Sequence, residues 1–239
     1  MSRRFFDPQP FQAGQPIALG TGASQHIGRV LRMAPGDAVT LFNGSGGEWT
    51  AVIKAVDKKS VTVTPTVFID RDRVPPLPVV LGLSLIKGER MDYAIQKATE
   101  LGVAEIHLLE TSRTEVRLKG DRESKKREHW HQVIVSACEQ CGLNRPPRLA
   151  GIDTLAAFID QASGLRLVAH PGEAPLGATA LRGTERITLL TGPEGGFAPD
   201  ELDAALTAGF QPFALGERVL RAETAPVALL AALWTLLDQ

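Results

Sequence analysis

The chain has 239 residues, a length that allows one large domain or two small ones. Hydrophobic residues make up 44% of it and charged residues 22%, and these ordinary proportions exclude a disordered or fibrous protein. The 26 basic and 27 acidic side chains nearly cancel, so the net charge of -1 does not by itself indicate a nucleic-acid-binding protein.

The charges are unevenly distributed along the chain. Residues 1–70 carry seven basic and five acidic side chains, residues 71–150 carry fourteen and eleven, and residues 151–239 carry five and eleven. The densest basic run lies within 113–127. Such a run is either a solvated loop and helix start or a surface that neutralises nucleic-acid phosphates with release of counterions.

Two features near the ends of the sequence indicate the cellular compartment of the protein. The longest nearly uninterrupted apolar run, 225–237, is shorter than the roughly 20 residues that a membrane span requires. The first eight residues contain two arginines and lack the apolar segment of a signal peptide. We therefore expect a soluble, cytoplasmic protein that makes no membrane contact.

The first 70 residues are expected to form a small β domain. Three runs rich in strand-forming residues are separated by turn residues, and they cover 38–42, 48–53 and 60–64. The glycines at 44, 46 and 47 fit a hairpin turn better than a phosphate-binding loop, because no helical periodicity follows them. Three prolines within 71–78 cannot donate to a strand ladder and indicate a linker.

After the linker the pattern alternates between strands and helices. Strands are predicted at 79–86, 105–109, 165–169, 186–191 and 212–215, and helices at 90–101, 124–141, 153–162, 199–208 and 225–237. The first of these helices should end at Gly102, and the last should be capped by Thr224. This alternation predicts a parallel α/β sheet with helices on both faces and with ligands at the carboxyl ends of the strands.

Several common chemistries lack support in the sequence. Cys138 and Cys141 form a lone CxxC late in a predicted helix, so buried thiols are favoured over a redox pair or a zinc site. The five histidines show no metal-ligand spacing, and no metal is expected. The chain has neither a Walker P-loop nor a GxGxxG following a strand, which argues against NTPases and dinucleotide dehydrogenases.

Two glycine-containing, polar segments near the C-terminus are the strongest candidates for a binding site. Leu-Leu-Thr-Gly-Pro-Glu-Gly-Gly-Phe covers 189–197 and runs from a predicted buried strand into the start of a helix. Leu-Gly-Glu-Arg-Val-Leu-Arg-Ala-Glu-Thr-Ala covers 215–225 and lies between a short strand and an apolar helix. The first is either a tight structural turn or a loop whose free N–H groups bind a ligand, and two such loops at strand ends favour one shared site.

These two segments resemble the bacterial RsmE family, which methylates N3 of a uridine in 16S ribosomal RNA and belongs to the SPOUT methyltransferases. Further matching segments are Arg-Arg-Phe-Phe at 3–6, the basic stretch 26–37, Lys-Gly-Glu-Arg-Met-Asp at 87–92 and 96–102, and 137–145, where Cys141 replaces an expected serine. The resemblance covers essentially the whole chain. It implies a PUA-like RNA-binding β-barrel over 1–72 and a SPOUT domain with a C-terminal trefoil knot over 73–239.

The resemblance also implies a cofactor, S-adenosylmethionine, bound in the knot by three loops. The residues expected to contact it are Ala169, His170, Leu190, Thr191, Gly192, Pro193, Gly196, Leu215, Gly216, Leu220 and Thr224. Two partners are implied as well. These are the ribosomal RNA of the small ribosomal subunit and a second copy of the chain in a homodimer.

The implied reaction removes the N3 proton of uracil and transfers a methyl group to that nitrogen. Arg221 is expected to stabilise the uracil oxyanion, because guanidinium stays charged and donates in a planar fork. Glu194 either orients the base or takes its proton, or is only a carboxylate at a helix N-terminus. The basic residues expected to contact RNA are Arg3, Arg4, Arg29, Arg32, Lys87, Arg90, Arg113 and Arg145.

Three other functions stay open at this point. A non-catalytic RNA-binding protein would account for the basic first 150 residues but not for the two loops. An enzyme for a small nucleotide-like ligand would account for the loops but not for the β domain. A methyltransferase of the same fold could also act on a different RNA.

Overall fold

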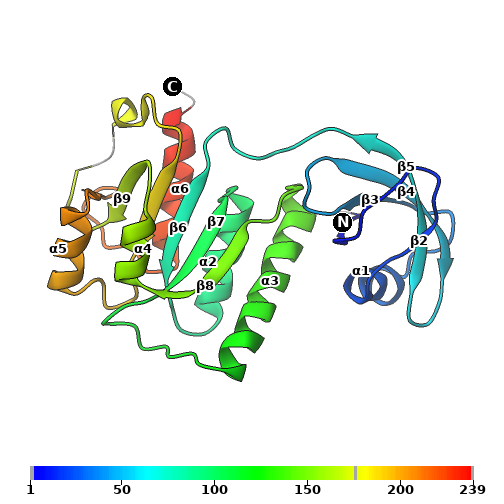
Figure 1. Ribbon diagram of the computed structural model, residues 1–239, viewed down its shortest axis with the longest axis horizontal. Coiled ribbons are helices and arrows are strands. Elements are labelled where there is room, and N and C mark those ends of the chain that lie inside the picture. The colour runs from blue at the N-terminus through cyan, green and yellow to red at the C-terminus, as the bar shows by residue number, and fades with distance from the viewer. Residues whose placement is uncertain (1–2, 175–176, 238–239) are drawn as a thin grey trace. The chain divides into compact units, whose positions relative to one another are not determined.

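A computed structural model describes residues 3–174 and 177–237, which divide into two compact units (Figure 1). One unit holds residues up to 74 together with 135–146, and the other holds 75–134 together with 147 onwards. The predicted domains were continuous, at 1–72 and 73–239, whereas this division adds the segment 135–146 to the N-terminal unit. The outermost ends of both predicted domains, 1–2 and 238–239, lie outside the described residues.

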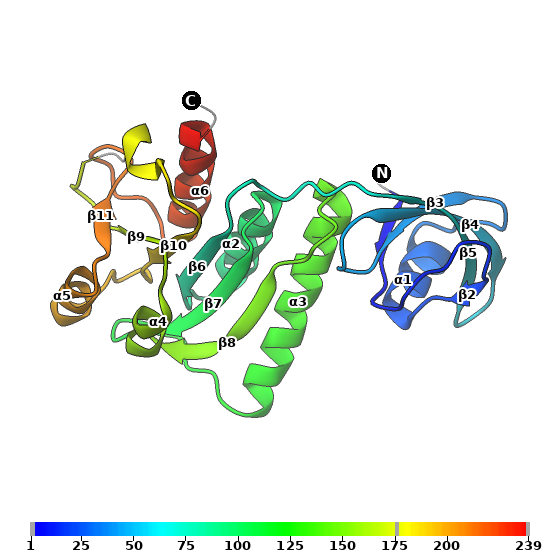
Figure 2. The same ribbon diagram turned by 45° about the horizontal axis from the view of Figure 1, so that its top comes forward.

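The N-terminal unit is built on a five-stranded sheet that curls around a short helical segment (Figure 2). Its strand order is β1-β3-β4-β5-β2, with β1 parallel to β3 and the other neighbours antiparallel. The strands are β1 (Arg4–Phe6), β2 (Ile17–Ala18), β3 (Ala38–Phe42), β4 (Glu48–Val56) and β5 (Val61–Ile69), and the helical turns are α1 (Thr21–Gln25) and η1 (His26–Val30). Phe5, Ile27, Leu41, Ile53 and Val63 form the centre of its core.

The hairpin predicted at the glycine-rich stretch is confirmed, because β3 and β4 pair in antiparallel register on either side of it. Gly44, Gly46 and Gly47 have φ angles of 87°, 99° and 65°, a region that other residues rarely adopt. A Cβ atom on Gly47 would also lie 2.3 Å from the ring of Phe68. The stretch is therefore a structural turn and not a phosphate-binding loop.

The C-terminal unit contains a six-stranded sheet in which all neighbouring strands are parallel. Its order is β11-β9-β10-β6-β7-β8, and the strands are β6 (Val79–Ser84), β7 (Glu105–Glu110), β8 (Arg148–Thr154), β9 (Leu165–Ala169), β10 (Ile187–Thr191) and β11 (Gln211–Phe213). The helical segments are α2 (Glu89–Glu100), α4 (Leu155–Gln161), η2 (Ala178–Leu181), α5 (Pro199–Thr207), α6 (Thr224–Leu237) and the part of α3 (Asp121–Cys141) up to residue 134, since the rest of α3 belongs to the N-terminal unit. The predicted α/β fold with a separate N-terminal β unit is confirmed.

Helices cover both faces of this sheet. On one face α4 and α5 pack over alternate strand residues, and Phe158 lies in the same cluster as Val80 and Leu190. A Cβ atom on Gly82 would lie 2.6 Å from the Phe158 ring, so a glycine is needed in β6 for this close approach. On the other face α2 and α6 lie together (Figure 1), and the Trp234 indole N–H donates to the Leu101 carbonyl at 2.7 Å.

The strand order reverses direction next to β6. The chain runs outward from β6 through β7 to β8, then returns to the other side of the sheet for β9, β10 and β11. Loops that leave the sheet on opposite sides of such a point open a crevice outside the carboxyl ends of the strands. The topology therefore places a binding site at the ends of β6 and β10.

Several predicted helix starts and strand positions differ from the structure, and the helix expected over 124–141 already begins at Asp121. The helix expected over 153–162 begins at Leu155, because residues 148–154 form β8, and the Thr154 hydroxyl accepts from the Ala157 N–H at 3.2 Å. The helix expected over 225–237 begins at Thr224, so the predicted cap residue lies in its first turn. The short elements β1, β2, α1 and η1 were not predicted, since two to five residues carry too little periodicity.

A buried charge cluster joins the segment 135–146 to the sheet of the N-terminal unit. Arg4 is paired with Glu48, Arg73 donates to the same Glu48 carboxylate at 3.1 Å, and Arg4 also donates to the Asn144 amide oxygen. Arg73 donates in addition to the Gly142 carbonyl at 2.8 Å. Burial by itself would raise the pKa of Glu48, but the hydrogen bonds from Arg73 and Arg4 outweigh it and hold this pKa below its ordinary value.

We expect Glu48→Gln to destabilise the protein by about 2–3 kcal/mol, because the substitution leaves two buried or half-buried arginines without their carboxylate. The folded-state pKa of Glu48 is lowered, so its contribution is complete above the ordinary pKa of 4.5 and is lost as the pH falls through the folded value. Urea unfolding between pH 7 and pH 3 measures both effects. The exposed Asp70→Asn serves as the control, and an unchanged unfolding free energy for Glu48→Gln would contradict the assignment.

Candidate functional site

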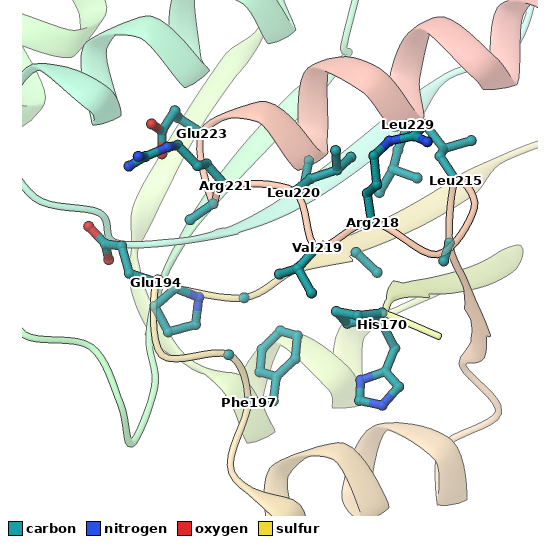
Figure 3. Close-up of a pocket in the computed structure, with 18 of the residues that line it drawn as sticks. His170, Glu194, Phe197, Leu215, Arg218, Val219, Leu220, Arg221, Glu223 and Leu229 are labelled. Carbon is teal, nitrogen blue, oxygen red and sulfur yellow. The ribbon is translucent and has the colours of Figure 1, made fainter. Parts of the chain in front are cut away.

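A cavity of about 500 Å³ lies at the carboxyl edge of the C-terminal sheet (Figure 3). Its walls come from the segments that follow β6, β7, β9, β10 and β11, and they include Arg90, Arg113, His170, Phe197 and Arg221. This volume lies within the range of pockets that bind small molecules and cofactors. The structure thus brings the two glycine-containing loops together in one cavity, as the sequence predicted.

The loop that follows β10 depends on its glycines. A Cβ atom on Gly192 would lie 3.2 Å from the Phe197 ring, and Gly196 has a φ angle of 67°. Pro193 is buried beside them, and the Gly196 N–H donates to its carbonyl at 2.9 Å. The segment is therefore a tight turn that also lines the cavity, and ligand binding by its N–H groups stays a prediction.

Glu194, in the same loop, is bound to the segment that follows β6. Its carboxylate accepts from the Lys87 backbone N–H at 3.2 Å and forms an ion pair with Arg90 at 3.4 Å. About a third of the side chain is exposed. The carboxylate is therefore occupied by contacts that join two loops of the cavity.

Two further interactions connect the loop after β7 to the loop after β10. The Arg113 guanidinium donates to the Gly195 carbonyl at 3.0 Å. Glu201 accepts from the Ser112 N–H at 2.7 Å with one carboxylate oxygen and from the Ala198 N–H at 2.9 Å with the other. The second bond satisfies a free donor at the start of α5, so one side chain caps the helix and holds the neighbouring loop.

The segment that follows β11 supplies most of the charge in the cavity. Arg218 and Arg221 line it together with Arg90 and Arg113, while Glu194 and Glu223 are the carboxylates of the lining. Val219 is 77% exposed, although it is apolar. A cavity with four guanidinium groups and two carboxylates favours an anionic ligand or substrate.

The residues predicted to contact a cofactor separate into two groups. Seven line the cavity, namely Ala169, His170, Gly192, Pro193, Gly196, Leu215 and Leu220. Four are not part of its lining, namely Leu190, Thr191, Gly216 and Thr224. Leu190 and Thr191 are fully buried in β10, and the Thr191 hydroxyl donates to the Gly82 carbonyl at 3.3 Å.

The residues predicted to contact RNA are also placed differently from one another. Arg90 and Arg113 line the cavity, and Lys87 adjoins it through its backbone bond to Glu194. In the N-terminal unit Arg3, Arg29 and Arg32 are exposed, whereas Arg145 is paired with Asp72 at 2.7 Å. The Arg4 side chain is only 13% exposed and is held by Glu48, which favours a structural role over the expected RNA contact.

The sequence did not single out several residues of the lining. Most are apolar, and they come from the end of β11, from the loops after β10 and β11 and from α6. Together with one carboxylate they are Phe197, Phe213, Ala214, Ala222, Glu223, Ala225 and Leu229. Glu223 is the one charged residue of this set, and it directly precedes the apolar helix α6. Its position within the second loop was visible in the sequence, but its approach to the cavity depends on how the loop returns to α6.

The buried-thiol interpretation of the CxxC holds for Cys138, whereas Cys141 is half-buried. Cys138 is fully buried, and burial raises the pKa of its thiol to about 12, so it is not a reactive thiolate near neutral pH. Within 3–174 and 177–237 no group of three or more His, Cys, Asp or Glu side chains could hold a metal ion. Over the same residues no helix is long and apolar enough to cross a membrane.

Comparisons with known proteins place this arrangement in a class. Residues 73–234 match the family model of an RNA methyltransferase domain, and residues 19–66 match that of an RNA methyltransferase PUA domain. A protein from Legionella pneumophila, described as a methyltransferase and solved with the bound cofactor SAM, is 38% identical with a TM-score of 0.93 over 98% of both chains. The fold is that of an RNA methyltransferase.

Named relatives identify the family. The ribosomal RNA small subunit methyltransferase E of Synechocystis is 33% identical over 93% of this chain and 74% of its own length. The protein of that name from Neisseria gonorrhoeae, solved with bound S-adenosyl methionine, is 33% identical with a TM-score of 0.90, over 98% of this chain and 97% of that one. This chain belongs to the ribosomal RNA small subunit methyltransferase E family.

We expect Glu201→Ala to destabilise the protein by about 1–2 kcal/mol, because two backbone N–H groups lose their acceptor. Hydrogen exchange should become faster at the amides of Ser112 and Ala198, and thermal unfolding reports the stability. Asp200→Ala, in the same helical turn, is the matched control and should change stability by less than about 0.5 kcal/mol. Unchanged exchange at both amides in Glu201→Ala would contradict the role of this side chain.

Proposed function

We propose that this protein transfers a methyl group from S-adenosylmethionine to N3 of a uridine in the 16S ribosomal RNA of the small ribosomal subunit. The observation that carries the proposal is the cavity at the carboxyl edge of the parallel sheet, in a chain of this family. Its relatives from Legionella pneumophila and Neisseria gonorrhoeae were solved with that cofactor bound.

The cavity suits the cofactor in size and in the character of its walls. Backbone lies exposed at Gly196, where a Cβ atom would meet open space, so a ligand can approach the main chain closely. Apolar surface from Leu215 and Leu220 is available to an aromatic base. When bound, the cofactor supplies a methyl carbon activated by a positively charged sulfur.

The residues of the chain are expected to act on the uracil. Arg221 donates to the oxygen on which negative charge develops as the N3 proton leaves. Glu194 already accepts from the Lys87 N–H and pairs with Arg90, and this favours a positioning role over proton transfer for its carboxylate. Arg90 and Arg113 then supply positive charge for the RNA at the rim of the same cavity.

The proposal also covers the RNA and protein partners, the cellular location and the domain boundary. Exposed Arg3, Arg29 and Arg32 in the N-terminal unit are proposed to contact RNA phosphates. A homodimer, a knotted C-terminal chain path and a cytoplasmic location follow from the resemblance to SPOUT methyltransferases. We also retain the proposed boundary near residue 72 between an RNA-binding domain and a catalytic domain.

Transfer of labelled methyl groups to purified small ribosomal subunits that lack the modification tests this function. We expect incorporation at N3 of one uridine of the 16S RNA, located by digestion and mass spectrometry. Free 16S RNA and transfer RNA serve as alternative substrates in parallel reactions. Methylation of transfer RNA instead would indicate a different target, and the absence of cofactor binding in calorimetry would favour a non-catalytic RNA-binding protein.

We expect Arg221→Ala to lower kcat by about 10²–10³-fold, because a preorganised donor to the developing oxyanion is lost. Cofactor affinity, measured by calorimetry, should change far less than kcat. Arg182→Ala, an exposed arginine outside the cavity lining, is the matched control. Near-normal turnover of Arg221→Ala with the cofactor bound would refute the role of this guanidinium.

We expect Arg29→Ala to weaken binding to the small subunit and to reduce the slope of log K against log salt by about one, since one phosphate contact is removed. Filter binding over a salt series measures this slope. Arg182→Ala, from the acidic C-terminal third of the chain, should leave it unchanged. A slope equal to that of the unsubstituted protein would remove Arg29 from the RNA interface.

A further inference from the structure

One of the two carboxylates of the cavity differs from the other in its surroundings. Glu223 follows β11 and directly precedes α6, and its side chain lines the cavity. Its Oε2 atom is shielded from solvent and has no hydrogen-bond partner within 3–174 and 177–237. Glu194, in contrast, accepts a backbone hydrogen bond and pairs with Arg90.

An unpaired buried carboxylate oxygen is unfavourable, because it has given up its hydration without gaining a donor in return. Such groups in native proteins are therefore uncommon, and each calls for an explanation, of which a catalytic role is one. A donor from a ligand would remove this cost. The surroundings of Glu223 thus favour a ligand that presents an N–H or O–H group at this point of the cavity.

The position of Glu223 within the cavity limits which ligand group this is. Glu223 and Arg221 are two residues apart in the chain and both line the cavity, and Figure 3 shows them in the part of the view where Glu194 also lies, away from His170 and Arg218. Glu223 is an acceptor and Arg221 is a donor, so together they present a donor and an acceptor in adjacent positions. The edge of uracil that contains N3 has the complementary pattern, with the N3–H donor directly between two carbonyl acceptors.

We propose that Glu223 is the catalytic base of the reaction and that it accepts the N3 proton of the uracil. This inference rests on the proposed methyl transfer to N3. The proton passes from N3 to the Glu223 carboxylate while Arg221 donates to the adjacent uracil oxygen. The freed N3 electron pair forms the new N–C bond to the methyl carbon, and the C–S bond breaks with its electrons going to sulfur.

The charges balance in this scheme. A carboxylate, a neutral base and a sulfonium become a carboxylic acid, a neutral methylated base and a neutral thioether. The carboxylic acid then releases its proton to water, which restores the enzyme. No further reactant is required.

The test compares Glu223→Gln, Glu223→Asp and the unsubstituted protein in the small-subunit methylation assay between pH 6 and pH 10. We expect Glu223→Gln to lower kcat near neutral pH by about 10²–10⁴-fold, the usual contribution of a general base. Cofactor affinity by calorimetry should remain within about twofold. Glu223→Asp should keep part of the activity, since a carboxylate is still present.

The pH profile separates a base from a structural residue. The rate of Glu223→Gln should rise about tenfold per pH unit as hydroxide increasingly ionises the uracil by itself, so that its defect shrinks at high pH. Glu217→Gln, an exposed carboxylate of the same loop outside the cavity lining, should match the unsubstituted protein. The defect of Glu194→Gln, a positioning variant, should not shrink at high pH.

Three results would overturn the assignment: normal turnover of Glu223→Gln, a defect that does not change with pH, or a loss of cofactor binding in parallel with activity. If Glu223→Gln fails to fold, as judged by circular dichroism, Glu223→Asp decides the matter. A folded Glu223→Asp that binds the cofactor supports the base if its activity is reduced but measurable. The same variant refutes the base if its activity is absent or equal to that of the unsubstituted protein. Absence of methyl transfer by the unsubstituted protein would instead refute the proposed function itself.

Discussion

The parallel pairing of the six strands in the C-terminal unit is the constraint on which the binding site depends. Because all neighbours run in the same direction, the carboxyl ends of β6, β7, β9, β10 and β11 meet at one edge of the sheet. Parallel strands require crossover helices on the faces, and this explains the fully buried β6 and the close contact of Gly82 with Phe158. Sheet topology therefore assembles loops from more than a hundred residues of sequence around one cavity.

Polar contacts between the loops hold the edge of this cavity in place. Glu201 connects the loop after β7 to the start of α5, and Arg113 donates to the loop after β10. Glu194 connects that loop in turn to the start of α2. Three successive loops are thus joined by side chains whose partners are mostly backbone groups, an arrangement that limits movement of the main chain where the proposed cofactor would lie.

The sequence predicted what depends on periodicity and turn chemistry, and it did not predict what depends on long-range packing. The buried apolar run of β6, the amphipathic face of α2 and the glycine turn between β3 and β4 follow from local patterns. β8 was absent from the prediction because its burial alternates irregularly beside a register shift against β7. Arg4 was expected to contact RNA, yet only the three-dimensional structure places it against Glu48, 44 residues away.

The sequence was also unable to distinguish the roles of the two carboxylates in the cavity. Glu194 and Glu223 both lie in polar loops that follow strands, and the sequence drew attention only to Glu194. What distinguishes them is the set of donors around each carboxylate, since Lys87 and Arg90 bind Glu194 whereas one oxygen of Glu223 is buried without a donor among the described residues. A carboxylate whose partners are already in place is suited to hold loops together. One whose donor must come from the substrate is suited to remove a proton, and the proposed roles follow from this difference.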